Sequence, residues 1–220
     1  MAQPGVLNGT AWLRDQIIQK AKMKILRPLI LALLVSLAGL ASAQTSNWTI
    51  DSKHSTAQFT VRHMGISNVS GSFTQVSGSA VINDKDITQS QVYAVIDVNS
   101  VDTRVPDRDK DLRSPNFFDA EKYPTIEFKS KRIVNSSGKL QMIGDLTMHG
   151  TTREVTLDLD APTAELTDNS GSQRRGFAAS TTISRKDFGV VWSHNLKSGE
   201  AVVSDNVKIQ IDVELVKKKG

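Results

Sequence analysis

The stretch Asn206–Val216, NVKIQIDVELV, alternates apolar and polar side chains from end to end. Its apolar members occupy every second position: Val207, Ile209, Ile211, Val213 and Leu215. Successive side chains of a β-strand point to opposite faces, so this spacing gives a strand one apolar face and one polar face. The stretch therefore predicts a long strand whose apolar side faces a core and whose other side faces water.

A period of two recurs along the chain before this strand. It is seen in AQFTVRH (57–63), QVYAVIDV (91–98), TIEFKSKR (125–132), LQMIGDLTM (140–148), REVTLDLD (153–160) and GFAASTTI (176–183). The Gly/Ser-rich residues 69–82 are expected to form one long, bent strand with a bulge at Gly71 or Gly78. Glycine-containing turns separate several runs, among them His149-Gly150, which predicts a two-residue hairpin.

These runs amount to about eight strands joined mostly by short loops. We predict an all-β fold, a closed antiparallel barrel of the lipocalin-like kind, because closure removes the exposed strand edges. A sandwich of two sheets fits the same periodicity and stays open as an alternative.

The longest connection, residues 100–124, breaks the regular pattern. Pro106 begins a charge-rich segment that indicates a short helix. Ser114 as an N-cap, followed by Pro115 at the first helical position, predicts a second short helical turn. A long ordered insertion between strands usually covers something, so we expect short helices here that close part of the barrel.

Two loops place large apolar rings where a protein surrounded by water rarely has them. Phe117 and Phe118 follow the predicted second turn, and we expect them to pack onto one end of the barrel. Either both rings plug that end, or one closes the core and the other touches a ligand. Phe188 and Trp192 lie in a second such loop and are expected at the opposite mouth.

The N-terminal residues have the three parts of a secretory signal peptide. A positively charged segment is followed by an apolar run of about a dozen residues and a small-residue site that ends at Ala43. The run is too short for an ordinary membrane-spanning helix, so we expect a signal helix at 23–43, cleavage after Ala43, and export to the periplasm. Residues 1–22 are an extension of open status, since Met23 is also a suitable start.

Residues 44–220 are expected to form a single domain, long enough to bury a core without staples. Removal of residues 1–43 takes away five basic residues and one acidic residue and leaves 22 of each. This balance gives no basic face for nucleic acid, which we exclude as a partner. The sequence has no cysteine, and therefore no disulfide, thiolate metal ligand or thiol nucleophile.

Catalytic patterns are weak. The four histidines lack metal-ligand spacing, and the sequence has neither a G-x-S-x-G elbow nor a P-loop. Asp107, Asp109 and Asp111 alternate with basic residues, which is typical of a solvated, self-paired helix surface rather than of a calcium loop. We therefore expect neither an enzyme nor a bound metal or cofactor.

The predicted inward face mixes large rings with small side chains. This mixture suits a hollow barrel around an apolar ligand, and it suits a tapered solid core equally well. His63 shares the inward face and is either a hydrogen-bonded rim residue or a polar contact for a ligand head group. The candidates for a cavity wall are Phe59, Val61, His63, Phe73, Ala94, Ile96, Phe117, Phe118, Ile126, Phe128, Met142, Leu146, Met148, Phe177, Ala179, Phe188 and Trp192.

Four segments together resemble the YceI-like family, exported bacterial proteins that bind polyisoprenoid lipids in an extended lipocalin-like barrel. They are WTIDSKHSTAQFTVRHMGISNVSGSF (48–73), DTRVPDRDKDLRSPNFFDAEKYPTIEFKS (102–130), GDLTMHGTTREVTL (144–157) and SRKDFGV (184–190). The resemblance extends from Trp48 to Val216. One position departs from the family pattern: Asp111 stands where the family usually has a histidine.

The resemblance implies a hollow barrel that carries an isoprenoid or quinone-like lipid, without catalysis and with transient membrane contact. It implies no cofactor beyond the lipid and no particular oligomeric state. Two other functions remain open: an enzyme that acts on a prenyl substrate in the same cavity, and a stress or interaction protein with a solid barrel.

Overall fold

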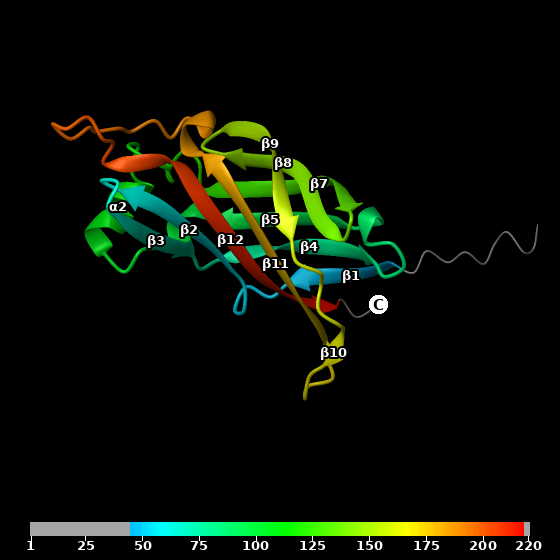
Figure 1. The fold of residues 1–220 in the computed structure, drawn as a ribbon. Helices are drawn as coiled ribbons and strands as arrows, with labels where there is room; N and C mark the ends of the chain where they lie inside the picture. The colour runs from blue at the N-terminus through cyan, green and yellow to red at the C-terminus, as the bar shows by residue number, and fades with distance from the viewer. Residues whose placement is uncertain (1–44, 218–220) are drawn as a thin grey trace, which may run out of the picture. The chain divides into compact units, whose positions relative to one another are not determined.

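The computed structural model describes residues 45–217, which form an all-β barrel with one short α-helix (Figure 1). The strands are β1 (Thr45–Ile50), β2 (Thr56–His63), β3 (Ser67–Phe73), β4 (Val76–Asn83), β5 (Gln91–Asp97), β6 (Val101–Asp102), β7 (Thr125–Ser136), β8 (Lys139–Met148), β9 (Thr151–Leu159), β10 (Leu166–Thr167), β11 (Gln173–Ser184) and β12 (Val203–Lys217). The connections contain the helix α2 (Pro106–Arg113) and three 3-10 turns, η1 (Ile87–Gln89), η2 (Val98–Ser100) and η3 (Arg185–Phe188). The predicted signal helix and the extension before it lie outside the described residues.

Eight antiparallel strand positions close the barrel. Around the ring the order is β11, β9, β8, β7, β5, β4, β1 and β12, and the pairing of β11 with β12 completes it. The strand β12 pairs with β2 over most of its length and with β1 at its C-terminal end, so β1 and β2 share one position in the ring. The predicted closed barrel of about eight strands is confirmed, and the sandwich alternative is wrong.

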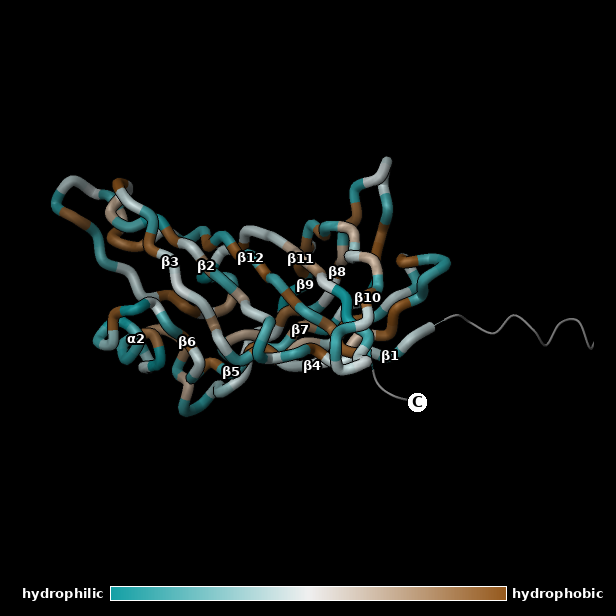
Figure 2. Tube along the Cα trace, turned by 90° about the horizontal axis from the view of Figure 1, so that it is seen from below, coloured by the Kyte–Doolittle hydropathy of each residue, from teal (hydrophilic) through white to brown (hydrophobic). Residues whose placement is uncertain are grey.

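The side chains alternate as the sequence indicated, and hydropathy alternates along the strands in Figure 2. The two-residue hairpin between β8 and β9 is confirmed. His149 and Gly150 have φ angles of 51° and 72°, which lie in the left-handed region that a type I′ turn requires at both positions. The turn between β7 and β8 has the same geometry at Ser137 and Gly138, with φ angles of 52° and 84°.

The Gly/Ser-rich segment 69–82 differs from the prediction, because it contains two strands and a break. The break lies at Thr74 and Gln75, whose backbone N–H groups bond to the carbonyl and hydroxyl oxygens of Ser100. Both ladders run in register through Gly71 and Gly78, so the bulge expected at one of these glycines was wrong. The bend results from a bond to a distant segment rather than from local glycine geometry.

The helix α2 begins at Pro106 as predicted, but the second helical turn does not form. Ser114 is the C-cap of α2 instead of an N-cap, and its hydroxyl donates to the carbonyl oxygen of Asp111 at 2.7 Å. The same hydroxyl accepts from the backbone N–H of Asn116 at 3.2 Å. The chain from Pro115 to Phe118 is a hydrogen-bonded turn.

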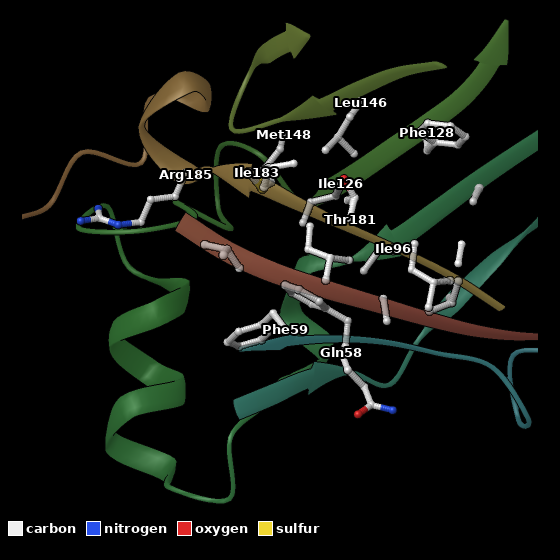
Figure 3. A pocket seen from close by; sticks show the side chains of 18 of the residues that line it. Gln58, Phe59, Ile96, Ile126, Phe128, Leu146, Met148, Thr181, Ile183 and Arg185 are labelled. Carbon is white, nitrogen blue, oxygen red and sulfur yellow. The ribbon is translucent and has the colours of Figure 1, made fainter. Parts of the chain in front are cut away.

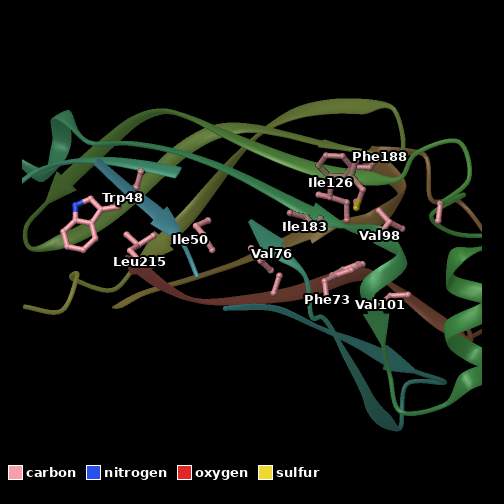
Figure 4. Close-up of a cluster of buried hydrophobic side chains, with 14 of the residues drawn as sticks. Trp48, Ile50, Phe73, Val76, Val98, Val101, Ile126, Ile183, Phe188 and Leu215 are labelled. Atoms are coloured by element: carbon pink, nitrogen blue, oxygen red, sulfur yellow. The ribbon is translucent and has the colours of Figure 1, made fainter. Parts of the chain in front are cut away.

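The barrel has two unlike ends. At the tryptophan end, Trp48 is completely buried (Figure 4). The charged groups of Arg175 and Lys217 lie 5.4 Å and 5.5 Å from the centre of a Trp48 ring. At the helix end lie α2, the β2–β3 turn and the long β11–β12 connection (Figure 1). The backbone N–H of Met64 donates to the carbonyl oxygen of Val202 at 2.9 Å, which holds two of these segments together.

Candidate functional site

The barrel encloses an apolar cavity of about 510 Å³ (Figure 3). Every barrel strand turns alternate side chains inward, so the wall is built from the residues that the period of two selects. The inward positions of β12, from Val207 to Leu215, all contribute to it. The volume falls within the range of roughly 300–1,000 Å³ that small-molecule sites occupy.

The structure places all but one of the predicted wall residues on this cavity. Those that border it are Phe59, Val61, His63, Phe73, Ala94, Ile96, Phe117, Phe118, Ile126, Phe128, Met142, Leu146, Met148, Phe177, Ala179 and Trp192. Phe188 is the exception. It is only 2% exposed and belongs to the packed core cluster shown in Figure 4. The prediction that Phe188 lines the cavity is corrected: it fills the wall of the barrel.

The two aromatic loops meet at one mouth. The ring of Phe117 lies 5.3 Å from that of Trp192, centre to centre, so both loops belong to the helix end. Placing Trp192 at the opposite mouth was therefore wrong. Phe118 points to another partner: its ring meets Phe73 edge-on at 5.5 Å, and Phe73 in turn lies 5.7 Å from Phe59. Phe118 thus continues the aromatic wall, while Phe117 and Trp192 lie across the opening.

Nearly all of the polar groups that border the cavity gather at the helix end. They are His63, Thr103, Arg108, Asp111 and Arg185, whereas Gln58 and Thr181 belong to strand interiors. The Gln58 side chain points away from the barrel interior in Figure 3. An amphiphile in this cavity would therefore find a largely apolar wall along its length and charged groups only at the mouth.

Arg108 is held by the segment that joins β6 to its helix. Its Nε donates to the hydroxyl of Thr103 at 2.7 Å, and its Nη2 donates to the Thr103 carbonyl oxygen at 3.0 Å. These bonds fix a cationic side chain at the cavity mouth, where hydrogen-bond donors can meet a ligand oxygen.

The helix α2 is only partly the solvated surface that the sequence suggested, because Asp107, Lys110 and Asp111 are exposed but Asp109 is not. Asp109 is buried, and its carboxylate accepts from the backbone N–H of Thr103 at 2.8 Å and from the Thr103 hydroxyl at 2.5 Å. Asp111 borders the cavity and accepts from the side-chain amide of Asn116 at 2.9 Å. Of the alternating acidic residues, Asp109 thus anchors the helix and Asp111 borders the cavity mouth.

Arg185 is a site residue that the sequence reasoning missed. It is buried at the end of β11, and its Nη1 donates to the carbonyl oxygens of Val190 and Trp192, each at 2.7 Å. Its Nη2 pairs with Asp205 at 3.0 Å. Burial lowers the pKa of the guanidinium, and the nearby Asp205 carboxylate opposes this shift. Arg185 therefore holds the Trp192 segment in place. In the sequence, Arg185 could have been found as a charged residue that stands between an apolar strand and a loop with aromatic residues.

A cluster outside the cavity has the outward look of a metal site. Asp51, His54 and Glu214 each offer a ligand atom within 4.8 Å of the others. However, the guanidinium of Arg174 donates to Asp51 at 2.9 Å, to Glu214, and to Asp168 at 2.6 Å. Hydrogen bonds from His54 and Arg174 lower the pKa of Asp51 to about 2. The arginine supplies the positive charge, so the cluster is an ion network that joins strand ends.

Residues 45–217 contain no helix that is both long enough and apolar enough to span a membrane.

Comparison with known proteins gives consistent matches. The model of the YceI-like domain matches residues 48–215. A UPF0312 protein of Vibrio parahaemolyticus is 37% identical over 161 residues, which cover 72% of this chain and 85% of that protein. The crystal structure of a Campylobacter jejuni YceI protein matches with a TM-score of 0.61 and 28% identity, covering 70% of this chain and 88% of that one. A polyisoprenoid binding domain from Saccharophagus degradans, at 17% identity, has a TM-score of 0.57 and covers 78% of this chain and 98% of that one.

Proposed function

The chain belongs to the YceI-like family, and we propose that it is a periplasmic carrier that holds a long-chain polyisoprenoid or quinone-like lipid in its barrel. One observation carries the proposal: the cavity wall is apolar along its length, with charged groups only at the helix end. The polyisoprenoid binding domain of similar fold supports the choice of lipid class.

The cavity favours a long apolar chain over a compact polar ligand. Each buried methylene group contributes about 0.8 kcal/mol, so ten of them contribute about 8 kcal/mol before the costs of association. The tail thus supplies the affinity. At the mouth, Arg108 and His63 offer donors to the oxygen of an alcohol or quinone head group.

We propose that the protein carries this lipid without altering it, and that it needs no metal or cofactor. The charged groups at the mouth already have structural partners: Arg108 is bonded to Thr103, and Arg185 to backbone carbonyl oxygens. Nucleic acid is not among the proposed partners, because acidic and basic residues balance in residues 44–220.

Mass spectrometry of an organic extract of the purified protein tests the proposal. We expect a prenyl lipid in the extract, and re-uptake of solanesol, a long-chain polyprenol, by protein from which the lipid has been removed. A protein that yields no lipid and takes up no solanesol would contradict the carrier function. A chemically altered prenyl lipid after incubation would support the enzyme alternative.

The proposed location is tested by the N-terminus of the mature protein. Because the small-residue site ends at Ala43, we expect sequencing of protein from the periplasmic fraction to begin at Gln44. Ala43→Arg should block cleavage and leave a longer form in the membrane fraction, whereas Ala41→Ser should still be processed. Recovery of the full-length chain from the cytoplasm would contradict this location.

A further inference from the structure

We propose that the helix end of the barrel docks directly on a lipid bilayer, so that the ligand passes between membrane and cavity without crossing water. This inference rests on the proposed carrier function and adds to it the surface that meets the membrane. The docking surface is the mouth rim, defined as Met64, Ile66, Val105 and Val191.

The rim residues are large apolar side chains that water surrounds. Ile66 is 77% exposed and Val191 is 62% exposed, and Met64 and Val105 are exposed as well. Among residues 45–217 only three other large apolar side chains are comparably exposed, namely Val81, Tyr93 and Leu166. Exposed apolar side chains gathered at one place indicate an interaction surface.

Three of the four rim residues lie within two positions of a residue that borders the cavity. Met64 follows His63, Val105 lies between Thr103 and Arg108, and Val191 lies next to Trp192. The rim therefore lies beside the opening, on the three loops that also carry residues of the cavity mouth. A lipid that leaves a bilayer at this opening would stay in apolar surroundings.

Two of the loops that carry rim residues also have arginines near these residues. Arg62 crosses the β2–β3 turn, with its Nε donating to the Gly65 carbonyl oxygen at 3.2 Å and its Nη1 to the Asn68 side chain at 3.1 Å. The turn that carries the exposed Ile66 is thus braced by a cationic side chain. Arg104, which has a left-handed φ of 63°, precedes Val105 and places a second cationic residue next to a rim residue. Arginines beside apolar loop tips suit the interface between phosphate groups and acyl chains.

The occupant is a bilayer rather than a second copy of the chain. The rim consists of four side chains on three separate loops, whereas a stable protein interface needs about 800 Å² of closely packed surface on each partner. The connections at the helix end (64–66, 98–124, 149–150 and 185–202) contain eight basic and eight acidic residues. They do not repel an anionic membrane, and the apolar contacts decide the binding.

Flotation with vesicles tests the surface. The double variant Ile66→Ser/Val191→Ser removes the two most exposed rim side chains without touching the cavity wall. Losing partial insertion of both should lower the vesicle-bound fraction of protein about tenfold. Leu166→Ser is the matched control, because Leu166 is 56% exposed but lies in β10, away from the helix end (Figure 1). It should bind like the parent.

Two vesicle types and a transfer assay complete the experiment. Phosphatidylcholine vesicles, with and without phosphatidylglycerol, should bind the parent to a similar degree. The rate of solanesol transfer from vesicles to protein should fall with binding in the double variant, while the lipid retained at equilibrium and the melting temperature stay unchanged.

The outcomes separate this inference from the carrier function. A parent protein that retains solanesol but does not float with vesicles would overturn the docking surface and leave the carrier intact. A protein that floats but retains no solanesol would instead contradict the carrier. A parent that is a dimer and becomes monomeric in the double variant would show that the rim joins two copies, which also overturns the inference.

Discussion

Phe117 and Phe118 are adjacent in the sequence but have separate partners. Phe118 packs edge-on against Phe73 and joins the buried core of the barrel. Phe117 contacts Trp192, on a segment that Arg185 fixes through carbonyl oxygens. The turn after Ser114 thus brings the two rings to different neighbours. Phe118 therefore supports the fold, and its neighbour Phe117 covers the opening.

The two phenylalanines should therefore respond differently to truncation. Phe118→Ala leaves a cavity in a packed cluster and should destabilise the protein by about 3 kcal/mol. Phe117→Ala loses one aromatic contact and should cost about 1 kcal/mol, but it should release bound lipid faster. Urea unfolding and the rate of lipid loss measure the two effects. If both variants unfold and release lipid as the parent protein does, neither ring covers the cavity.

The carboxylate of Asp51 gives the protein a component of acid sensitivity. Its pKa is lowered from 3.8 to about 2 by the hydrogen bonds from His54 and Arg174. A carboxylate with a lowered folded-state pKa stabilises the protein above its unfolded pKa, and this stabilisation is lost as the pH falls through about 2. The network therefore contributes at neutral pH and fails in acid.

Asp51→Asn should lower the free energy of unfolding by about 1–2 kcal/mol at neutral pH. The difference from the parent should shrink between pH 3.8 and about 2, where the parent carboxylate takes up its proton. Urea unfolding at several pH values measures it, with the exposed Asp187→Asn as a control outside the network. A difference that is the same at every pH would contradict the assignment.

At the scale of elements, the packing of strands β7 and β8 depends on a residue without a side chain, Gly144. Gly144 of β8 faces Phe128 of β7, and a Cβ placed at Gly144 would lie 2.5 Å from Cζ of that ring and 2.5 Å from the carbonyl oxygen of Lys129. Nearby, the β7–β8 register shifts between Ser130 and Arg132. Glycine lets the Phe128 ring cross the neighbouring strand and reach the cavity wall.

Gly144→Ala should displace the ring and the backbone of β7, and destabilise the barrel by about 2 kcal/mol. Gly176→Ala is a matched change in β11, where the new Cβ would come no closer than 3.3 Å to Thr163. It should cost less than about 1 kcal/mol. Thermal melts of both variants measure the contrast, and equal losses would show that the space beside Phe128 is not what Gly144 provides.

At the largest scale, the barrel of residues 45–217 has one packed end and one polar mouth. Buried Trp48 lies at one end, the aromatic pair Phe117 and Trp192 lies at the other, and the apolar cavity lies between them. Small side chains on the wall, such as Ala94 and Ala179, leave space that larger ones would fill. Whether that space serves a ligand can be tested by filling it.

Ala94→Trp and Ala179→Trp place an indole ring in the cavity. In a solid barrel such overpacking would destabilise by about 1–3 kcal/mol. In this hollow barrel, at least one variant should keep its ligand-free stability and lose most of its lipid, because ring and tail compete for the same volume. Melts of lipid-free protein and mass spectrometry of the bound fraction measure both. A marked drop in melting temperature for both variants, with no lipid in the parent, would sink the carrier proposal.

The sequence by itself determined most of the strands, their inward faces and the His149-Gly150 hairpin, but not the break at Thr74 and Gln75. These follow from local rules: a strand alternates its side chains, and a type I′ turn takes residues that accept a positive φ, as at His149-Gly150. For this reason the wall residues on the strands, such as Phe59 and Ala179, could be chosen from parity, whereas Phe117 and Phe118 were chosen as rings in a loop.

Only the tertiary structure decided which segments meet. Phe188 packs into the core instead of the cavity, Asp109 is buried against Thr103, and Trp192 shares its mouth with Phe117. Each depends on a partner outside its own element, and no local spacing encodes such contacts. Barrel closure has the same origin, because it comes from ladders between strands far apart in the chain, such as β1 with β12. The period of two in the sequence identifies the side chains of the cavity wall. The pairing of strands that are far apart in the chain closes this wall around a cavity.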